Sequence, residues 1–229
     1  MHFDIVSRCV MGLLTKEDFE FIFHSDDTDF LRDSARAALE VKRLFFGETI
    51  QLFHPGSVFP AFSLTGAECS LSCRHCNKSY LRGMIASETP QDLVRECLRL
   101  HKGGAKGCLL SGGFDAKGRL PVKPFLKAIR QIKQTTGFKF AIHPGLLDQE
   151  EVKGLRGAGV DAVCPEIIGE PDVAERVSGL RRTGDDYLEA LRLLKKEGFS
   201  RLAPHVCIGL DGGRMSHELN ALQVAAQVK

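Results

Sequence analysis

Residues 61–76, AFSLTGAECSLSCRHC, join a short apolar run to a loop that carries three cysteines. The run at 61–64 is typical of a buried β-strand. Cys69, Cys73 and Cys76 follow it at spacings of four and three. In β/α architectures the loops at the carboxyl ends of the strands hold the chemistry. The stretch therefore predicts a strand with a functional loop directly behind it.

From residue 61 onward, short apolar runs alternate with longer amphipathic ones, which is the pattern of β/α units around a parallel sheet. Glycines stand where each expected helix leads into the next strand, as such loops require. We expect strands at 61–64, 107–110, 139–142, 161–164 and 201–208. We expect helices at 90–101, 122–135, 148–156, 185–197 and from 216 to the end of the chain.

These units make part of a barrel. A closed eight-unit barrel takes roughly 250 residues, so the chain from residue 61 supplies about five units. The sequence therefore predicts an α/β fold, a partial (β/α) barrel with about five or six parallel strands. We expect residues 1–58 to form an N-terminal helical extension and residues 59–229 to form the barrel, which we expect to be incomplete at its C-terminus.

Two start signals indicate helices in the first sixty residues. Thr15, with Asp18 three residues later, is typical of a capping box. Thr28 is the second start signal, and Gly47 is expected to end the helix that follows it. Between them, apolar residues recur at helical spacing, namely Leu31, Ala35, Ala38, Val41 and Phe45.

The composition excludes several classes of protein. Of the 229 residues, 43% are hydrophobic, which is enough for a sizeable core and rules out a mainly disordered chain. The 31 Lys and Arg nearly balance the 29 Asp and Glu, so we expect neither nucleic acid nor a membrane as a partner. The sequence has neither an apolar run of about 18 residues nor a signal-peptide pattern, so we expect a cytoplasmic protein.

Eight cysteines are the compositional feature to explain, and three of them fall within eight residues. A reducing cytoplasm argues against a disulfide framework. Thiolate is the ligand that iron–sulfur clusters and zinc prefer. Structural zinc normally has four protein ligands in two short-spaced pairs, and His75 is poorly placed as the fourth. Three cysteines on a cubane cluster leave one iron open to a small molecule.

The Cys-x3-Cys-x2-Cys pattern after a first strand resembles the radical S-adenosylmethionine (SAM) superfamily. The resemblance implies that Cys69, Cys73 and Cys76 bind three irons of a 4Fe–4S cluster and that SAM chelates the fourth. It also implies that one electron cleaves SAM to methionine and a 5′-deoxyadenosyl radical, which abstracts a hydrogen atom from the substrate. His75 stands where the family usually has an aromatic residue beside the adenine; it is either a stacking partner or a solvated loop histidine.

Further strand ends carry candidate SAM contacts by the same resemblance. Ser111, Gly112 and Gly113 match the family's glycine-rich motif for the SAM amino group, and glycine permits close backbone approach. The acidic residue usual after this motif is missing, since Phe114 stands there and Asp115 follows. Glu166, after the fourth expected strand, is either a SAM contact or a solvated carboxylate. Gly209 resembles the fifth-strand motif that lies along the adenine.

Other residues have two interpretations. His143 either faces the substrate or is a turn histidine without a catalytic duty, and Arg181 and Arg182 either pair with the SAM carboxylate or are surface charges. Three strand cysteines are expected to pack in the core as small hydrophobic residues. The alternative for them is an auxiliary cluster inside the barrel, of the kind that biotin synthase holds. These cysteines are Cys108, Cys164 and Cys207.

The chain from about residue 28 onward resembles the biotin synthase-like branch and is most similar there to one subunit of the two-protein lipoyl synthase. The stretches that carry this resemblance are 59–69, 105–113 and 204–213. It implies sulfur insertion into an octanoyl chain on a lipoyl-carrier protein, with a second radical SAM subunit and a reductant such as ferredoxin or flavodoxin. The alternatives are a biotin synthase-like or other cofactor-biosynthesis reaction on a small molecule, and a non-catalytic scaffold with a structural metal.

Overall fold

The computed structural model describes residues 2–50, 52 and 54–228. It divides into two compact units, residues 1–54 and 55–229. The boundary expected after residue 58 stays a prediction, because compactness alone does not show where a domain folds independently. None of the described helices is long and apolar enough to cross a membrane.

The first unit consists of three helices, α1 (His2–Val10), α2 (Lys16–His24) and α3 (Thr28–Phe46). The predicted capping box of Thr15 and Asp18 is confirmed, with both reciprocal hydrogen bonds present. Helix α3 begins at Thr28 as expected, but Asp27 is its cap, accepting the amides of residues 29 and 30. A carboxylate directly before the helix satisfies two free amides and favours the positive end of the helix dipole.

The second unit contains a five-stranded sheet in which every pairing is parallel, in the order β2-β1-β3-β4-β5. Phe62 of β1 pairs with Leu110 of β3, which in turn pairs with Ile142 of β4. All three of these side chains are fully buried. The strands are β1 (Ala61–Ser63), β2 (Ile85–Ala86), β3 (Gly107–Ser111), β4 (Lys139–Ile142) and β5 (Ala162–Val163).

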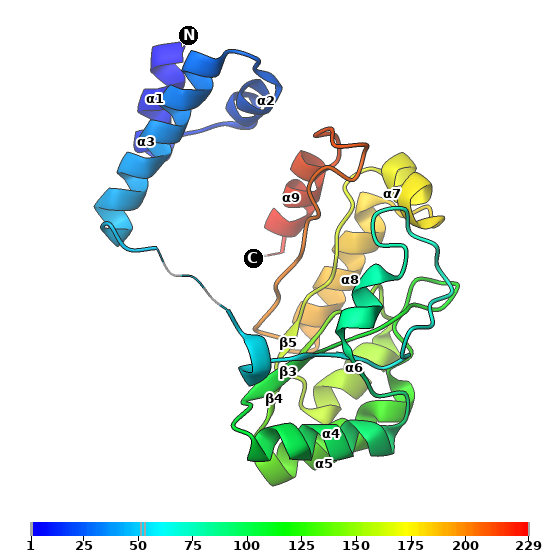
Figure 1. Ribbon diagram of the computed structural model, residues 1–229. Coiled ribbons are helices and arrows are strands. Elements are labelled where there is room, and N and C mark those ends of the chain that lie inside the picture. Colours follow the sequence, from blue (N-terminus) through cyan, green and yellow to red (C-terminus); the bar gives the residue numbers. More distant parts are fainter. Residues whose placement is uncertain (1, 51, 53, 229) are drawn as a thin grey trace. The chain divides into compact units, whose positions relative to one another are not determined.

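Helices follow the strands and cover the sheet (Figure 1). Three of them share one core with the strands, in which Leu93 of α4, Ile129 of α5 and Leu155 of α6 are fully buried. A second apolar cluster joins the last three helices. The helices are α4 (Pro90–Lys102), α5 (Leu126–Thr136), α6 (Gln149–Ala158), α7 (Pro171–Ser178), α8 (Gly184–Lys196) and α9 (Glu218–Ala226).

The expected fold class is confirmed, since the unit is a partial barrel of parallel strands with helices ahead of it, but one strand was misplaced. The expected strand at 201–208 is not regular: it pairs beside β5 only through Leu202 with Val163 and His205 with Glu166. Residues 203 and 205 donate to Val163 and Pro165, but Pro165 has no amide to return a hydrogen bond to residue 203, so the ladder is broken between the two bridges. Strand β2 and helix α7 were not predicted.

Candidate functional site

The three-cysteine loop runs between β1 and β2 at the carboxyl edge of the sheet, which is where it was expected. Its three leucines, Leu64, Leu71 and Leu81, are buried and anchor it to the unit. Cys69, Cys73 and Cys76 are free and half-buried. Behind the last of them the chain takes a left-handed turn, with φ of 40° at Asn77 and 60° at Lys78. The loop thus holds three thiols in one tightly turned segment.

The turn after β3 is hydrogen-bonded to this loop. The Phe114 amide donates to the Cys69 sulfur at 3.2 Å, and the Ser70 amide donates to the Phe114 carbonyl at 2.8 Å. On its other side, the loop donates the Arg74 amide to the carbonyl of Val177 in α7. An amide aimed at a cysteine sulfur stabilises thiolate charge and is one of the means by which proteins tune iron–sulfur clusters.

Gly113 allows the turn and the loop to approach so closely. A Cβ at this position would lie 1.9 Å from the Glu68 carbonyl oxygen and 2.6 Å from the Cys69 Cα. The Gly113 amide donates to the Thr65 hydroxyl at 2.6 Å. Sequence reasoning missed Thr65, although a hydroxyl residue directly behind a strand end was a usable signal. Any larger residue than glycine would push the turn away from the first cysteine.

The three thiols lie in one another's electric field. Burial raises the pKa of Cys73 to about 11, and the acidic groups of Cys76, Cys69 and Glu166 add to the rise. Negative charge is therefore costly here unless a cation accompanies it. Iron supplies that cation, and coordination deprotonates a thiol outright. The donor set, the amide on Cys69 and the close approach that Gly113 allows together fit a 4Fe–4S cluster.

Within the described ranges 2–50, 52 and 54–228, no group of three or more His, Cys, Asp or Glu side chains could hold a single metal ion. A 4Fe–4S cluster does not need such a group, because each cysteine binds an iron of its own. A single tetrahedral zinc ion, by contrast, would need such a group, because zinc–sulfur bonds of about 2.3 Å bring the sulfurs to about 3.8 Å from one another.

The remaining predicted site residues differ in how close they lie to the three cysteines. Ser111 is buried at the end of β3, and Gly112 follows with φ of 151°, so both lie beside the cysteine loop. Glu166 lies close enough to Cys73 to raise the pKa of its thiol. His75 is exposed on the loop. Gly209 lies in a turn, not on a strand, and its amide donates to Glu218 of α9 at 2.7 Å.

Three rings form a row along the carboxyl ends of successive strands. The His143 ring stacks on Phe114 at 6.2 Å and on His205 at 5.6 Å between centroids. Burial lowers the pKa of His143, Glu166 raises it and His205 lowers it, with the net shift downward. An imidazole with a lowered pKa is neutral at pH 7. Sequence reasoning did not foresee this row, because it joins three loops that are distant in the sequence.

Of the three strand cysteines expected in the core, Cys108 and Cys164 are buried, whereas Cys207 is only half-buried. Cys108 of β3 and Cys97 of α4 are fully buried, and burial together with the neighbouring Cys97 thiol raises the pKa of Cys108. Cys108 therefore points toward the helices and away from the barrel interior. Burial raises the pKa of both Cys164 and Cys207.

The two arginines differ in their surroundings. Arg181 is exposed and donates to Asp172 and Glu175, on α7. Arg182 donates to the carbonyl of Lys117, in the loop that follows β3, at 2.6 Å. Both arginines thus contact a segment that is hydrogen-bonded to the cysteine loop, Arg181 through α7 and Arg182 through the loop after β3.

Comparison with known families and proteins places the chain in context. The family model of the radical SAM superfamily matches residues 64–219, which is well over half of the chain. Biotin synthase of Bacillus cytotoxicus is 26% identical over 198 residues, covering 82% of this chain and 55% of that protein. Biotin synthase of Bacillus subtilis is 24% identical over 234 residues, covering 99% of this chain and 65% of that protein. The chain therefore spans between about half and two thirds of these relatives.

Two solved structures share the fold. Methylornithine synthase (PylB) has a TM-score of 0.63 at 18% identity, over 97% of this chain and 63% of that one. The FeFe-hydrogenase maturase HydG of Carboxydothermus hydrogenoformans has a TM-score of 0.66 at 16% identity, over 98% of this chain and 51% of that one.

The family match covers the cysteine loop, the turn after β3 and every later strand end described above. It implies a 4Fe–4S cluster and SAM as cofactors, in agreement with the donor set and the amide that reaches Cys69. By this match the chain belongs to the radical SAM superfamily, as a distant relative of biotin synthase.

Proposed function

We propose that this chain catalyses a biotin synthase-like radical reaction on a small molecule of cofactor biosynthesis. With cluster and SAM bound, one electron from a reductant such as ferredoxin or flavodoxin cleaves SAM to methionine and a 5′-deoxyadenosyl radical, which takes a hydrogen atom from the substrate. The observation that carries the proposal is the hydrogen bond from the Phe114 amide to the Cys69 sulfur, at 3.2 Å, between two loops at the carboxyl edge.

In this proposal Cys69, Cys73 and Cys76 hold the cluster, each on one iron. The Phe114 amide stabilises the negative charge on the Cys69 sulfur. Cys73 is half-buried, and burial raises the pKa of its thiol, so a neighbouring cation favours the thiolate. The redox potential of a cluster held here would be set in part by such hydrogen bonds and by local charge.

SAM is proposed to lie against the glycine turn and the neighbouring strand ends. Ser111, Gly112 and Gly113 are its proposed neighbours on the side of β3, and Glu166 supplies a carboxylate that can accept from its amino group or ribose hydroxyls. His75 and Gly209 are the proposed neighbours of the adenine. His75 is exposed and therefore free to turn toward a ligand.

The ring row is proposed to line the substrate side of the site. Stacked rings at the mouth of a barrel exclude water, which protects a reactive radical from side reactions. Because the pKa of His143 is lowered, the imidazole is neutral at pH 7 and can donate or accept one hydrogen bond. It can thus orient a polar group of the substrate without adding charge.

The lipoyl synthase interpretation stays a prediction, with an octanoylated lipoyl-carrier protein and a second radical SAM subunit as its expected partners. Biotin synthases are among the relatives, which favours a reaction on a small molecule, although the tRNA-2-methylthio-N(6)-dimethylallyladenosine synthase of Clostridioides difficile is also 27% identical over 175 residues. Methionine and 5′-deoxyadenosine should be counted with an octanoylated carrier plus partner, and separately with free small molecules. Stimulation by the carrier alone would favour the lipoyl reaction over the small-molecule one.

Reconstitution under anaerobic conditions tests the core of the proposal. We expect roughly four irons per chain and SAM cleavage when a reductant is added. Cys73→Ala should lose both iron and cleavage, whereas Cys97→Ala, which alters a buried core thiol, should keep both. Stoichiometric zinc without iron in the wild-type chain would instead support a structural scaffold and would refute the proposed function.

A further inference from the structure

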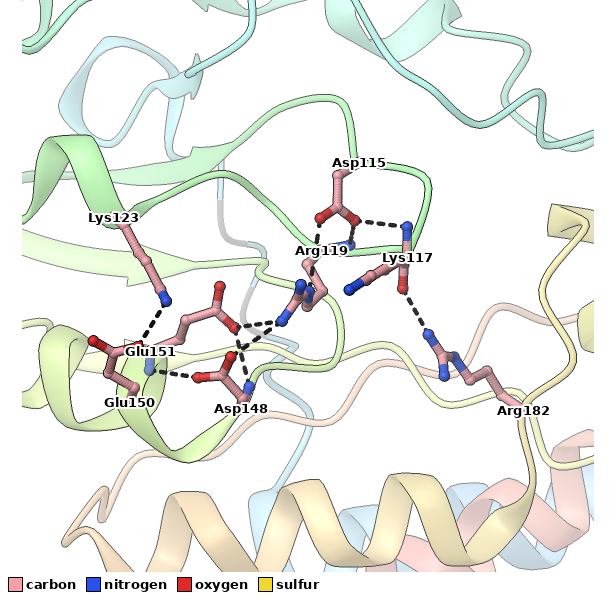
Figure 2. Close-up of polar contacts among 8 residues, drawn as sticks. All are labelled: Asp115, Lys117, Arg119, Lys123, Asp148, Glu150, Glu151 and Arg182. Atoms are coloured by element: carbon pink, nitrogen blue, oxygen red, sulfur yellow. Dashed lines mark hydrogen bonds and ion pairs between the residues drawn. The ribbon is translucent and has the colours of Figure 1, made fainter.

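Arg119 lies among three carboxylates at the carboxyl edge of the sheet (Figure 2). Its Nη1 is 3.1 Å from Asp148 Oδ2 and 3.4 Å from Glu151 Oε2, and its Nε is 3.6 Å from Asp115 Oδ2. The Arg119 side chain is 24% exposed and that of Glu151 only 8%. Ion pairs that are partly removed from water are screened less than those on the surface. The guanidinium therefore ties the loop after β3 to the start of α6.

The same loop is closed on itself by Asp115. The Asp115 carboxylate accepts the amides of Lys117 and Arg119, each at 2.9 Å. The Asp115 amide in turn donates to the Arg119 carbonyl at 2.9 Å, and the Gly118 amide donates to the Asp115 carbonyl. Residues 115–119 thus form a compact turn. These hydrogen bonds hold residues 115–119 together, and the Asp115 carboxylate already accepts two of them.

A second contact clamps the turn against the loop that follows β4. Arg119 pairs with Gly145 in an antiparallel bridge, and the Leu120 amide donates to the Pro144 carbonyl at 2.9 Å. A Cβ on Gly145 would lie 2.1 Å from the Gly118 carbonyl oxygen, so the two backbones are in direct contact. The turn therefore has a fixed place against the second loop as well as against the helix.

The turn begins one residue after the amides that reach the cysteine loop. Gly113 donates to Thr65, and Phe114 donates to the Cys69 sulfur. We propose that Arg119 is a positioning residue: by clamping the 115–119 turn it fixes the Gly113 and Phe114 amides against the cysteine loop and thereby sets the affinity for SAM. This inference rests on the proposed function, because it takes the cysteine loop as the cluster site.

Lys123 and Glu150 provide a matched control on the same face. Their ion pair is 2.9 Å long and also joins the segment after β3 to α6, but the two side chains are 49% and 83% exposed. Neither contacts the 115–119 turn in Figure 2. Arg119→Gln and Lys123→Gln each remove one positive charge from the same surface. Lys123→Gln therefore separates a general effect of charge from the loss of the Arg119 contacts. Arg182, which also donates to Lys117, stays unchanged in every variant.

The experiment compares Arg119→Gln, Arg119→Lys and Lys123→Gln as anaerobically reconstituted full-length proteins. Iron content, thermal midpoint, the Kd for SAM by equilibrium dialysis and the EPR spectrum of the reduced cluster with and without SAM are measured well below the midpoint. We expect Arg119→Gln to bind SAM about tenfold more weakly and to show a smaller SAM-induced EPR change, with iron retained. Arg119→Lys keeps the positive charge but lacks the planar, several-donor geometry of the guanidinium. It should therefore fold and lose less affinity for SAM than Arg119→Gln does.

The outcomes separate the two proposals. A SAM Kd and EPR response in Arg119→Gln equal to those of the wild type would overturn the positioning role. An equal loss in Lys123→Gln would also overturn it, because the effect would then follow surface charge. A lower thermal midpoint with an unchanged SAM Kd would assign Arg119 to stability alone. A wild-type chain that takes up no cluster would contradict the proposed function instead.

Discussion

Gly113→Ala is the sharpest single test of how closely the turn after β3 must approach the cysteine loop. The added methyl would lie 1.9 Å from the Glu68 carbonyl oxygen and 2.6 Å from both the Cα and the Cβ of Cys69. These atoms belong to the backbone and to the base of a side chain, so no rotamer change can clear the space. Gly113 does not have a left-handed φ, so alanine adds bulk without backbone strain.

The size of the displacement follows from these distances. A carbon and a carbonyl oxygen in contact are normally about 3.3 Å or more apart, so the turn and the loop must separate by about 1.4 Å. Overpacking of this kind costs about 1–3 kcal/mol of folding free energy. A misplacement of about 1 Å can cost a site about a hundredfold in rate. The hydrogen bond from Phe114 to the Cys69 sulfur, now 3.2 Å, would be broken.

The assay compares Gly113→Ala with Gly83→Ala after anaerobic reconstitution. Gly83 lies near the end of the same loop, and a Cβ there would meet nothing within 4 Å. We expect Gly83→Ala to keep the wild-type iron content, SAM Kd and thermal midpoint. We expect Gly113→Ala to remain folded by circular dichroism but to lose SAM-dependent changes in the EPR spectrum. Full iron content and wild-type SAM affinity in Gly113→Ala would refute this reasoning.

Three further predictions concern the ring row, the sheet and the core. Because burial lowers the pKa of His143 from 6.5, the unfolded chain binds that proton more readily, so stability is lost as pH falls below about 6.5. His143→Phe should flatten this dependence of the urea midpoint while keeping the stack; an unchanged slope would show that His143 does not cause it. Asp161 is partly buried and pairs with Lys133 and Lys139, so Asp161→Asn should lower the free energy of unfolding by about 1–3 kcal/mol in urea melts. If the melts coincide, these pairs do not stabilise the sheet. Cys108→Ala should cost about 1 kcal/mol and leave the iron count unchanged, and a loss of iron would revive an auxiliary cluster.

The sequence predicted regular elements well where they were long or strongly patterned. Strand β4 matches its expected range at 139–142, and β3 extends only one residue beyond its expected range. Strand β2 was missed because two residues carry no period. Helix α7 is only eight residues long and begins at Pro171, a helix-start signal that was not used. The strand expected at 201–208 is irregular because Pro165, on the neighbouring segment, has no amide to donate to residue 203.

The candidate site was predictable in its ligand types but not in its packing. The spacing of Cys69, Cys73 and Cys76 was visible in the sequence because all three lie in one loop. The amide that reaches Cys69 comes from Phe114, forty-five residues away, and the stack of His143 on His205 joins two loops. Such contacts depend on how strands pair, which no local pattern specifies. Gly209 was expected on a strand but lies in a turn, for a similar reason: its amide donates to Glu218, which belongs to a helix later in the chain.

Strand β2 holds the two ends of the cysteine loop side by side in the sheet. Its residues Ile85 and Ala86 pair with Phe62 and Ser63, so the loop leaves β1 and returns to the same strand. Residues 64–84 therefore form a closed loop. The pairing of β2 with β1, and not a cofactor, offsets the entropic cost of bringing the two ends of this loop together. Losing the cofactor therefore frees only the inside of the loop and leaves the strand register intact. Insertion and repair of the cluster can then proceed on a folded chain, without passage through the unfolded state.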